Sequence, residues 1–331
     1  MRPDRVIRRW LKGREYRALL DEVAEALAAG RHADAEAACA RAVAIAEELH
    51  GADDVELVTP LYALSSARLA QGRLEEAIAS CRRAIALAEG AGGAADPPLP
   101  RLLEQLAAIF ERQEKPLEVE ALFRKVLAGY ERMRDPDPGE LSALLNRLGL
   151  LLGREGRRDE AAPLLERAVA LREGALGPGH PLVAEALYNA ATLRGAGLSP
   201  ADAEAMLRRA LAIVEVEGGA GAHAALRASI LHNLAVTREE QGAPDEAAEL
   251  YERALAAREA LVGPDHRELR PTLVRLARLH HAAGRISAAL PLYERALALA
   301  TAELGLGHPV PAAIDAWITE ARSNNARGRR V

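Results

Sequence analysis

Four histidines recur at nearly constant spacing and are the first candidates for chemistry in this chain of 331 residues. They are His180, His223, His266 and His308, with spacings of 43, 43 and 42 residues. Zinc requires ligands about 2 Å from one point, whereas equivalent points on stacked helical units lie roughly 10 Å apart. We therefore expect these histidines to serve loop packing or hydrogen bonds at helix starts, and we expect no metal site.

The two cysteines, Cys39 and Cys81, are too few for a disulfide framework or a zinc cluster. They stand 42 residues apart, at one position of a repeat described below, which favours a role as small buried hydrophobes. The sequence contains no Walker, G-x-S-x-G or HExxH motif. We expect neither a catalytic site nor a cofactor, and hence no enzyme.

A basic column suggests nucleic acid at first sight, but acids such as Glu166, Glu252 and Glu294 stand beside it. The net charge of −5 and the pI near 6.1 differ from the basic character that is typical of nucleic-acid-binding proteins. We therefore interpret the column as a solvated helix face and expect no nucleic-acid partner. Its members are Arg41, Arg83, Lys125, Arg167, Arg209, Arg253 and Arg295.

A 42-residue repeat positions all of these residues. Each unit has one turn point, and successive turn points lie 42, 42, 42, 42, 44 and 42 residues apart. A small residue stands five and twelve residues after most turn points, and a large residue or cysteine stands nine after. These spacings place the three positions on one helix face, where small residues let helices approach closely. The turn points are Gly30, Gly72, Glu114, Gly156, Leu198 (preceded by Gly197), Gly242 and Gly284.

Each repeat is predicted to be a helical hairpin, with one helix before the turn point and one after it. Glycine ends the first helix because it adopts the left-handed conformation without strain, and units of this kind must stack to bury their faces. We expect an all-α fold: a right-handed superhelical solenoid of about seven hairpins over 14–309, with a capping helix at 310–322. A basic segment, 1–13, should precede the solenoid, and a basic disordered tail, 323–331, should follow it.

The repeats resemble the tetratricopeptide repeat (TPR) family, in particular its kinesin-light-chain-like subgroup with 42-residue units. The resemblance rests on "LNRLGLLLGREGRRDEAAPLLERAVALREGALGPGHP" (145–181), "LHNLAVTREEQGAPDEAAELYERALAAREALVGPDH" (231–266) and "GRISAALPLYERALALATAELGLGHP" (284–309). The third unit departs most, because Glu114 replaces glycine and Val119 and Val126 replace alanines. The resemblance implies that the first helix of each hairpin lines a concave groove that binds partner proteins.

The groove candidates stand near the position ten residues before each turn point. As solvent-facing residues they should contribute little to folding, while asparagine amides could pair with any peptide backbone. A plain solvated face is the alternative interpretation. The candidates are Tyr62, Glu104, Asn146, Tyr188, Asn189, Thr192, His232, Asn233, Arg278 and His281.

We therefore expect a protein-binding scaffold that takes a protein or peptide partner in this groove. The alternative is a regulatory or sensory subunit whose catalytic partner, such as a protease or kinase, is another chain. No apolar run approaches the ~18 residues of a membrane span, and no secretory signal is visible, so a cytoplasmic location is expected. The basic segment 6–20 most simply covers the first repeat, with an anionic membrane as a weak alternative. The sequence does not specify the oligomeric state.

Overall fold

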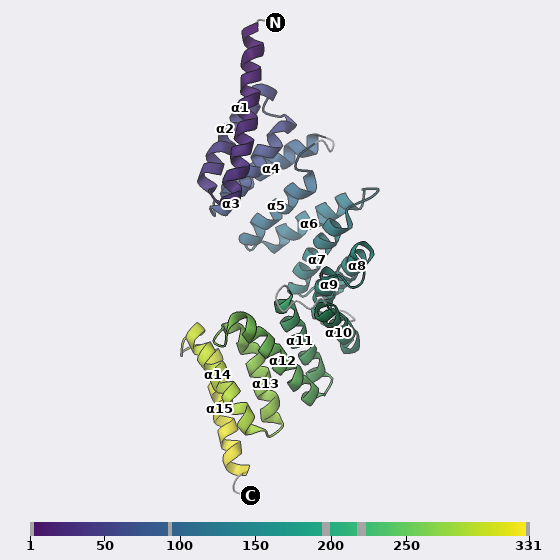
Figure 1. Ribbon diagram of the computed structural model, residues 1–331, viewed down its shortest axis with the longest axis vertical. Coiled ribbons are helices and arrows are strands. Elements are labelled where there is room, and N and C mark those ends of the chain that lie inside the picture. Colours follow the sequence, from purple (N-terminus) through teal and green to yellow (C-terminus); the bar gives the residue numbers. More distant parts are fainter. Residues whose placement is uncertain (1–2, 92–94, 194–198, 217–222, 329–331) are drawn as a thin grey trace. The chain divides into compact units, whose positions relative to one another are not determined.

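A computed structural model of the chain describes residues 3–91, 95–193, 199–216 and 223–328. Within these residues the fold is all-α, with two short 3-10 turns and no strand (Figure 1). The helices of the first half are α1 (Pro3–Ala28), α2 (His32–His50), η1 (Val55–Leu57), α3 (Val58–Ala70), α4 (Leu74–Gly90), α5 (Leu99–Arg112) and α6 (Pro116–Tyr130). Those of the second half are α7 (Pro138–Arg154), α8 (Arg158–Leu176), α9 (Pro181–Thr192), α10 (Pro200–Val216), α11 (Ala224–Glu240), α12 (Pro244–Val262), η2 (Arg267–Leu269), α13 (Arg270–Ala282), α14 (Ile286–Leu304) and α15 (Pro309–Gly328).

The helices form two compact units, each a stack of hairpins. Unit 1, Met1–Pro136, contains the hairpins α1/α2, α3/α4 and α5/α6. Unit 2, Asp137–Val331, contains α7/α8, α9/α10, α11/α12 and α13/α14, and α15 packs on α14. Within each unit the second helix of one hairpin contacts the first helix of the next. The predicted stacking of helical hairpins is therefore confirmed within each unit, and a terminal helix follows the last hairpin.

The turn points end the first helices in the left-handed conformation, as predicted. The glycines at five of them have φ between 69° and 79°, and Leu198 lies outside the described residues. Glu114 also has a positive φ, of 55°, although it carries a side chain. The repeat geometry thus imposes the conformation even where the sequence offers no glycine, at a cost of roughly 1–2 kcal/mol.

Replacing Glu114 by glycine should therefore raise the free energy of unfolding by roughly 0.5–1 kcal/mol, because relief of this cost outweighs the destabilising gain in unfolded-state entropy that glycine brings. The reciprocal change Gly156→Ala should lower it by about 1 kcal/mol, because a φ of 79° strains a residue that carries a Cβ, and the open space at Gly156 adds no clash to that strain. Urea unfolding of both variants measures these two changes in the free energy of unfolding. Stabilisation by Gly156→Ala would show that the left-handed turn is not imposed.

The core consists of the predicted small and large columns. The position twelve residues after each turn point is at most 1% exposed in all seven repeats, from Ala42 to Ala296. The position nine after is equally buried, with Phe123, Tyr251 and Tyr293 among the largest buried side chains. The two helices of a hairpin approach closely at Gly149 of α7, where an added Cβ would lie 2.7 Å from Cγ of Leu165 on α8. Small residues therefore set the spacing of the two helices in each hairpin.

Three of the four recurring histidines cap helix starts. The Nδ1 atoms of His180, His266 and His308 accept hydrogen bonds from the backbone N–H two residues later, at 3.2, 3.4 and 3.2 Å. Asp54 does the same before η1, at 2.9 Å. His223 precedes α11 without such a bond. The helix-start interpretation is thus confirmed for three of them, and it satisfies backbone donors that helix termini leave unpaired.

The basic column on the second helices is exposed, but it is not merely solvated. Five of its seven members form ion pairs with a glutamate of the preceding repeat, 36 or 38 residues earlier in the chain. Exposed pairs of this kind contribute at most about 1 kcal/mol each, so they align neighbouring repeats more than they stabilise them. The pairs are Arg83–Glu47 at 2.6 Å, Arg209–Glu173 at 2.5 Å, Arg253–Glu215 at 3.0 Å, Lys125–Glu89 and Arg295–Glu259.

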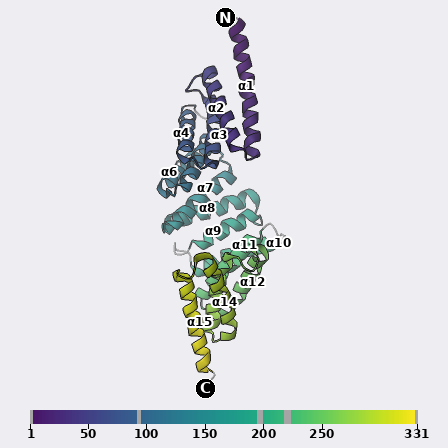
Figure 2. The ribbon, with the colours of Figure 1, turned by 90° about the vertical axis from the view of Figure 1, so that its left-hand side faces the viewer.

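Both ends of the chain are more helical than predicted. α1 runs from Pro3 through Gly13 without a break, so the segment 1–13 is largely part of the first helix of the first hairpin. α15 runs to Gly328 and includes the first six residues of the predicted tail, because no breaker interrupts the sequence before that glycine. α15 lies beside α14 in both views (Figures 1 and 2). In the described part of the chain no helix is long and apolar enough to cross a bilayer.

Candidate functional site

The predicted groove residues of unit 2 lie on consecutive first helices and are joined by hydrogen bonds between repeats. Asn146 of α7 is buried, at 7% exposure, and its Oδ1 accepts a hydrogen bond of 2.9 Å from Nδ2 of Asn189 on α9. The hydroxyl of Thr192 donates to the backbone oxygen of Asn189 at 2.8 Å. One end of the row thus connects α7 to α9.

The row continues from α9 to α13. Nδ2 of Asn233 on α11 donates to the hydroxyl oxygen of Tyr188 at 3.2 Å and to the backbone oxygen of Ser229 at 3.1 Å. Nδ1 of His232 lies 2.9 Å from Oγ1 of Thr272 on α13. We call the residues Asn146, Tyr188, Asn189, His232, Asn233 and Thr272 the polar row.

The polar row is therefore part of the packing between repeats. The sequence predicts solvent-facing side chains with little role in folding, and that prediction is wrong for Asn146, which is buried, and incomplete for its half-buried neighbours. The cause is the close contact of successive first helices, which pairs side chains 43 to 45 residues apart. A substitution at one position therefore leaves a partner atom in the neighbouring repeat without its hydrogen bond.

Asn189→Ala should accordingly lower the free energy of unfolding by about 1–3 kcal/mol, since it leaves Oδ1 of the buried Asn146 without its partner. Adding Asn146→Leu should recover much of this loss, because both polar partners are then replaced by apolar groups. A double-mutant cycle, with each variant unfolded in urea, measures the coupling free energy between the two asparagines. Strictly additive losses would contradict the pairing of the two amides.

A hollow of about 210 Å³ opens beside the row. The predicted residues Tyr188, His232 and Asn233 line it together with Thr272 of the row. Its remaining lining residues are Ser229, Arg258, Glu268 and Pro271. The hollow lies where α9, α11 and α13 meet the end of α12, and hydroxyl, amide, imidazole, guanidinium and carboxylate groups all face it.

Sequence analysis missed Arg258, Ser229 and Glu268. Nη2 of Arg258 donates to Oγ of Ser229 at 2.8 Å, and Nη1 lies 3.3 Å from a carboxylate oxygen of Glu268. The repeat contains a signal for this arginine: Arg172 stands at the same position two repeats earlier and donates to the backbone oxygen of Leu182 at 2.7 Å. An arginine sixteen residues after the turn point thus connects a second helix to the start of the next repeat, at Leu182 in one case and at Glu268 in the other.

In unit 1, Tyr62 on α3 and Glu104 on α5 are both half-buried. Their helices are linked by Gln105, whose Nε2 donates to Oγ of Ser66 at 2.6 Å and to the backbone oxygen of Tyr62 at 3.3 Å. Gln105 stands nine residues before its turn point, where Asn189 and Asn233 stand in their repeats. That shared position is the signal that could have identified it.

The two remaining candidates lie near the terminal helix. The guanidinium carbon of exposed Arg278 is 5.6 Å from the centre of the Trp317 ring, and the His281 ring meets Tyr293 edge-on at 6.1 Å. Trp317 itself lies 6.0 Å from Tyr293. The structure therefore places Arg278 against α15 and His281 against α14, apart from the hollow at Tyr188.

The other candidates for chemistry are packing residues. Burial raises the pKa of the Cys39 and Cys81 thiols to about 12, which is far from the range of a reactive thiolate. Burial, together with the hydrogen bond that its hydroxyl donates to Glu239 at 2.9 Å, also raises the pKa of Tyr251. Among the described residues no group of three potential ligands could hold a metal ion. The polar row and its hollow are thus the strongest candidate site.

Stacked helical hairpins with a polar row on their first helices define a helical-repeat protein. The family profile of the tetratricopeptide repeat matches residues 16–89, 62–132, 140–215 and 226–302, which is most of the chain. The protein belongs to the tetratricopeptide repeat family. Comparison with curated protein sequences gives no match.

Solved structures agree with this assignment. The crystal structure of BtubC (BKLC) from P. vanneervenii is 27% identical, with a TM-score of 0.57 over 71% of this chain and 94% of that one. A kinesin light chain from Podosopora anserina, with nearly identical TPR-like repeats, is 23% identical, with a TM-score of 0.51 over 62% and 96%. A tetratricopeptide repeat protein from Parabacteroides merdae matches 93% of this chain and 99% of its own, at 14% identity and a TM-score of 0.55. The last two likenesses concern the fold alone.

Proposed function

We propose that this protein is a non-enzymatic scaffold that binds an extended segment of a partner protein along the polar row of unit 2. The observation that carries this proposal is the hollow where Tyr188, His232 and Asn233 come together from α9 and α11. Membership of a repeat family whose fold suits protein–protein interaction supports it.

The chemistry of the hollow suits a peptide backbone. The Tyr188 hydroxyl accepts a hydrogen bond from Asn233 and retains its own proton to donate. Asn233 uses its amide nitrogen in these bonds, which leaves the amide oxygen as an acceptor for a peptide N–H. Tyrosine adds rigid amphipathic area of the kind enriched at interfaces.

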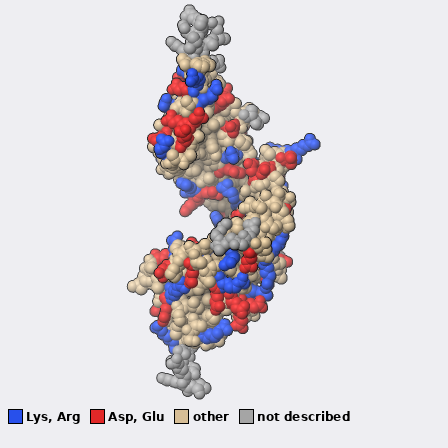
Figure 3. Space-filling model, in the orientation of Figure 1, with Lys and Arg blue, Asp and Glu red and all other residues tan. Residues whose placement is uncertain are grey.

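The charges around the hollow favour main-chain recognition over a charged ligand. Arg258 and Glu268 bring one charge of each sign and already pair with each other at 3.3 Å. The face of the molecule drawn in Figure 3 likewise carries charges of both signs. Affinity should therefore come from hydrogen bonds and a few side-chain anchors.

Photo-crosslinking of the full chain tests the location of the partner. A benzophenone amino acid replaces Glu268, which lines the hollow and has a half-exposed side chain, and in a second protein it replaces Arg209 on α10. We expect crosslinks to one partner from position 268 and none from position 209. Crosslinks from position 209 alone would reject the row as the site, and crosslinked residues scattered over a folded catalytic chain would favour a regulatory subunit.

A further inference from the structure

One core column is interrupted in the sixth repeat. The position fifteen residues after the turn point holds isoleucine or leucine in five of the seven repeats, and glycine or alanine in the other two. In unit 2 the large residues are at least partly buried, with Ile213 and Leu299 each 8% exposed. The column reads Ile45, Leu87, Gly129, Leu171, Ile213, Ala257 and Leu299.

A hollow of about 560 Å³ lies at Ala257, between α10, α11 and α12. This volume falls within the range of roughly 300–1,000 Å³ that is typical of small-molecule sites. Most of its lining is aliphatic, as such sites require. The aliphatic lining residues are Val214, Ala224, Leu231, Ala256, Ala257, Ala260 and Leu261, and the polar ones are Glu215, His223, Arg227 and Arg253.

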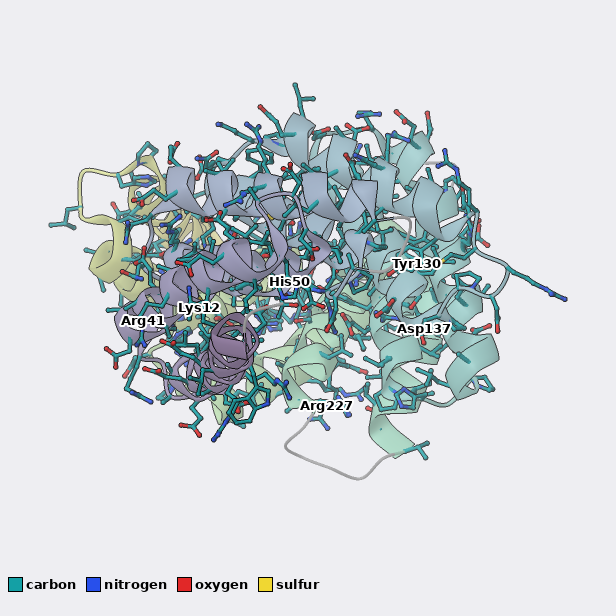
Figure 4. All side chains as sticks on the ribbon, turned by 90° about the horizontal axis from the view of Figure 1, so that it is seen from above. Lys12, Arg41, His50, Tyr130, Asp137 and Arg227 are labelled. Atoms are coloured by element: carbon teal, nitrogen blue, oxygen red, sulfur yellow. The ribbon has the colours of Figure 1, made fainter. Side chains whose placement is uncertain are left out.

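Among the described residues that line this hollow, one positive charge has no ion-pair partner. Arg253 forms an ion pair with Glu215 at 3.0 Å. The Arg227 side chain, which extends from the first turn of α11 (Figure 4), makes no hydrogen bond or ion pair with any residue that the structure describes. An arginine guanidinium presents a fork of donors that fits a carboxylate in a bidentate manner.

We propose that this hollow binds an aliphatic monocarboxylate, with the hydrocarbon against the alanines of α12 and the carboxylate paired with Arg227. A single negative charge balances the guanidinium of Arg227, so a monoanion fits better than a phosphate dianion. The same chemistry has two sources: a free fatty-acid-like molecule, and the C-terminal leucine of a peptide. The hollow shares no lining residue with the one beside the polar row, so the site is independent of the proposed scaffold function.

Calorimetric titration of the full chain tests this site. The probes are octanoate and a short peptide with a free C-terminal leucine, and the controls are octanamide and the same peptide with an amidated C-terminus. Two variants disable the site: Ala257→Leu, which restores the residue type of the column, and Arg227→Gln. Ala298→Leu on the exposed face of α14 and Arg267→Gln on the surface are matched controls.

We expect at least one carboxylate to bind the unmodified chain and its amide to bind at least about tenfold more weakly. Ala257→Leu and Arg227→Gln should each weaken binding by at least about tenfold, while the two control variants and Tyr188→Ala/Asn233→Ala bind like the unmodified chain. Binding of octanoate alone identifies a free amphiphile, and binding of the peptide alone identifies a chain terminus. The proposal is overturned if neither carboxylate binds at millimolar concentration, or if Ala257→Leu, folded by thermal melting, binds as tightly as the unmodified chain.

Discussion

Replacing Ala168 by leucine should lower the free energy of unfolding by roughly 1–3 kcal/mol, because extra methyl groups are forced into a tightly packed contact. Ala168 lies on α8, is fully buried, and belongs to the column that is at most 1% exposed in every repeat. On the same helix Leu165 already lies within van der Waals distance of the α7 backbone at Gly149. A larger side chain there must displace the backbone or force neighbouring side chains out of their preferred rotamers.

The matched control is Ala170→Leu, two residues further along α8 on its exposed face. It makes the same chemical change and should alter stability by less than about 0.5 kcal/mol. Urea unfolding monitored by helical circular dichroism measures both. Equal losses in the two variants would show that the buried face of the second helices has been assigned wrongly.

Deleting 310–331 should also have a large effect, because α15 covers the apolar end of unit 2. Ile314 and Ile318 of α15 are at most 2% exposed, and Trp317 packs on Tyr293 of the last hairpin. Losing two buried isoleucines alone removes roughly 3–6 kcal/mol of hydrophobic stabilisation. We expect the deletion to fray the α13/α14 hairpin or to make the protein associate through the exposed surface.

Thermal melting and light scattering measure this result, and deletion of 323–331 is the control. The shorter deletion keeps the buried residues Ile314, Ile318 and Ala321. It should shift the melting temperature by no more than a few degrees. If the long deletion melts like the full chain and stays monodisperse, α15 does not act as a cap.

The fold was predictable because the same spacing of small and large residues recurs in seven repeats. A small residue twelve positions after the turn point is ambiguous in one hairpin, but its recurrence from Ala42 to Ala296 defines a buried face. Even Glu114, the turn point that lacks glycine, adopts the left-handed conformation of the others. The boundaries were less predictable, because nothing in the sequence near Gly13 or Arg322 stops a helix.

The sequence indicated which helices carry the candidate residues, but it did not predict their hydrogen bonds or their burial. The spacing of Tyr188 and His232 placed them on neighbouring first helices, and both line one hollow. Pairings between repeats, such as Asn146 with Asn189, depend on the distance between helices, which a one-dimensional pattern does not contain. The ion pairs of the basic column, such as Arg209 with Glu173 of the preceding repeat, were not predictable for the same reason.

The measurement that tests the central claim most directly is the affinity of the crosslinked partner segment, as a purified peptide, for the variant Tyr188→Ala/Asn233→Ala. The two side chains hydrogen-bond to each other, so removing both together breaks that bond without leaving either partner of it unpaired. We expect the dissociation constant to rise at least about tenfold, or roughly 1.4 kcal/mol. Arg209→Ala/Arg295→Ala on the second helices should leave it unchanged. Loss of affinity in the arginine variant with full affinity in the Tyr188/Asn233 variant would contradict binding along the polar row.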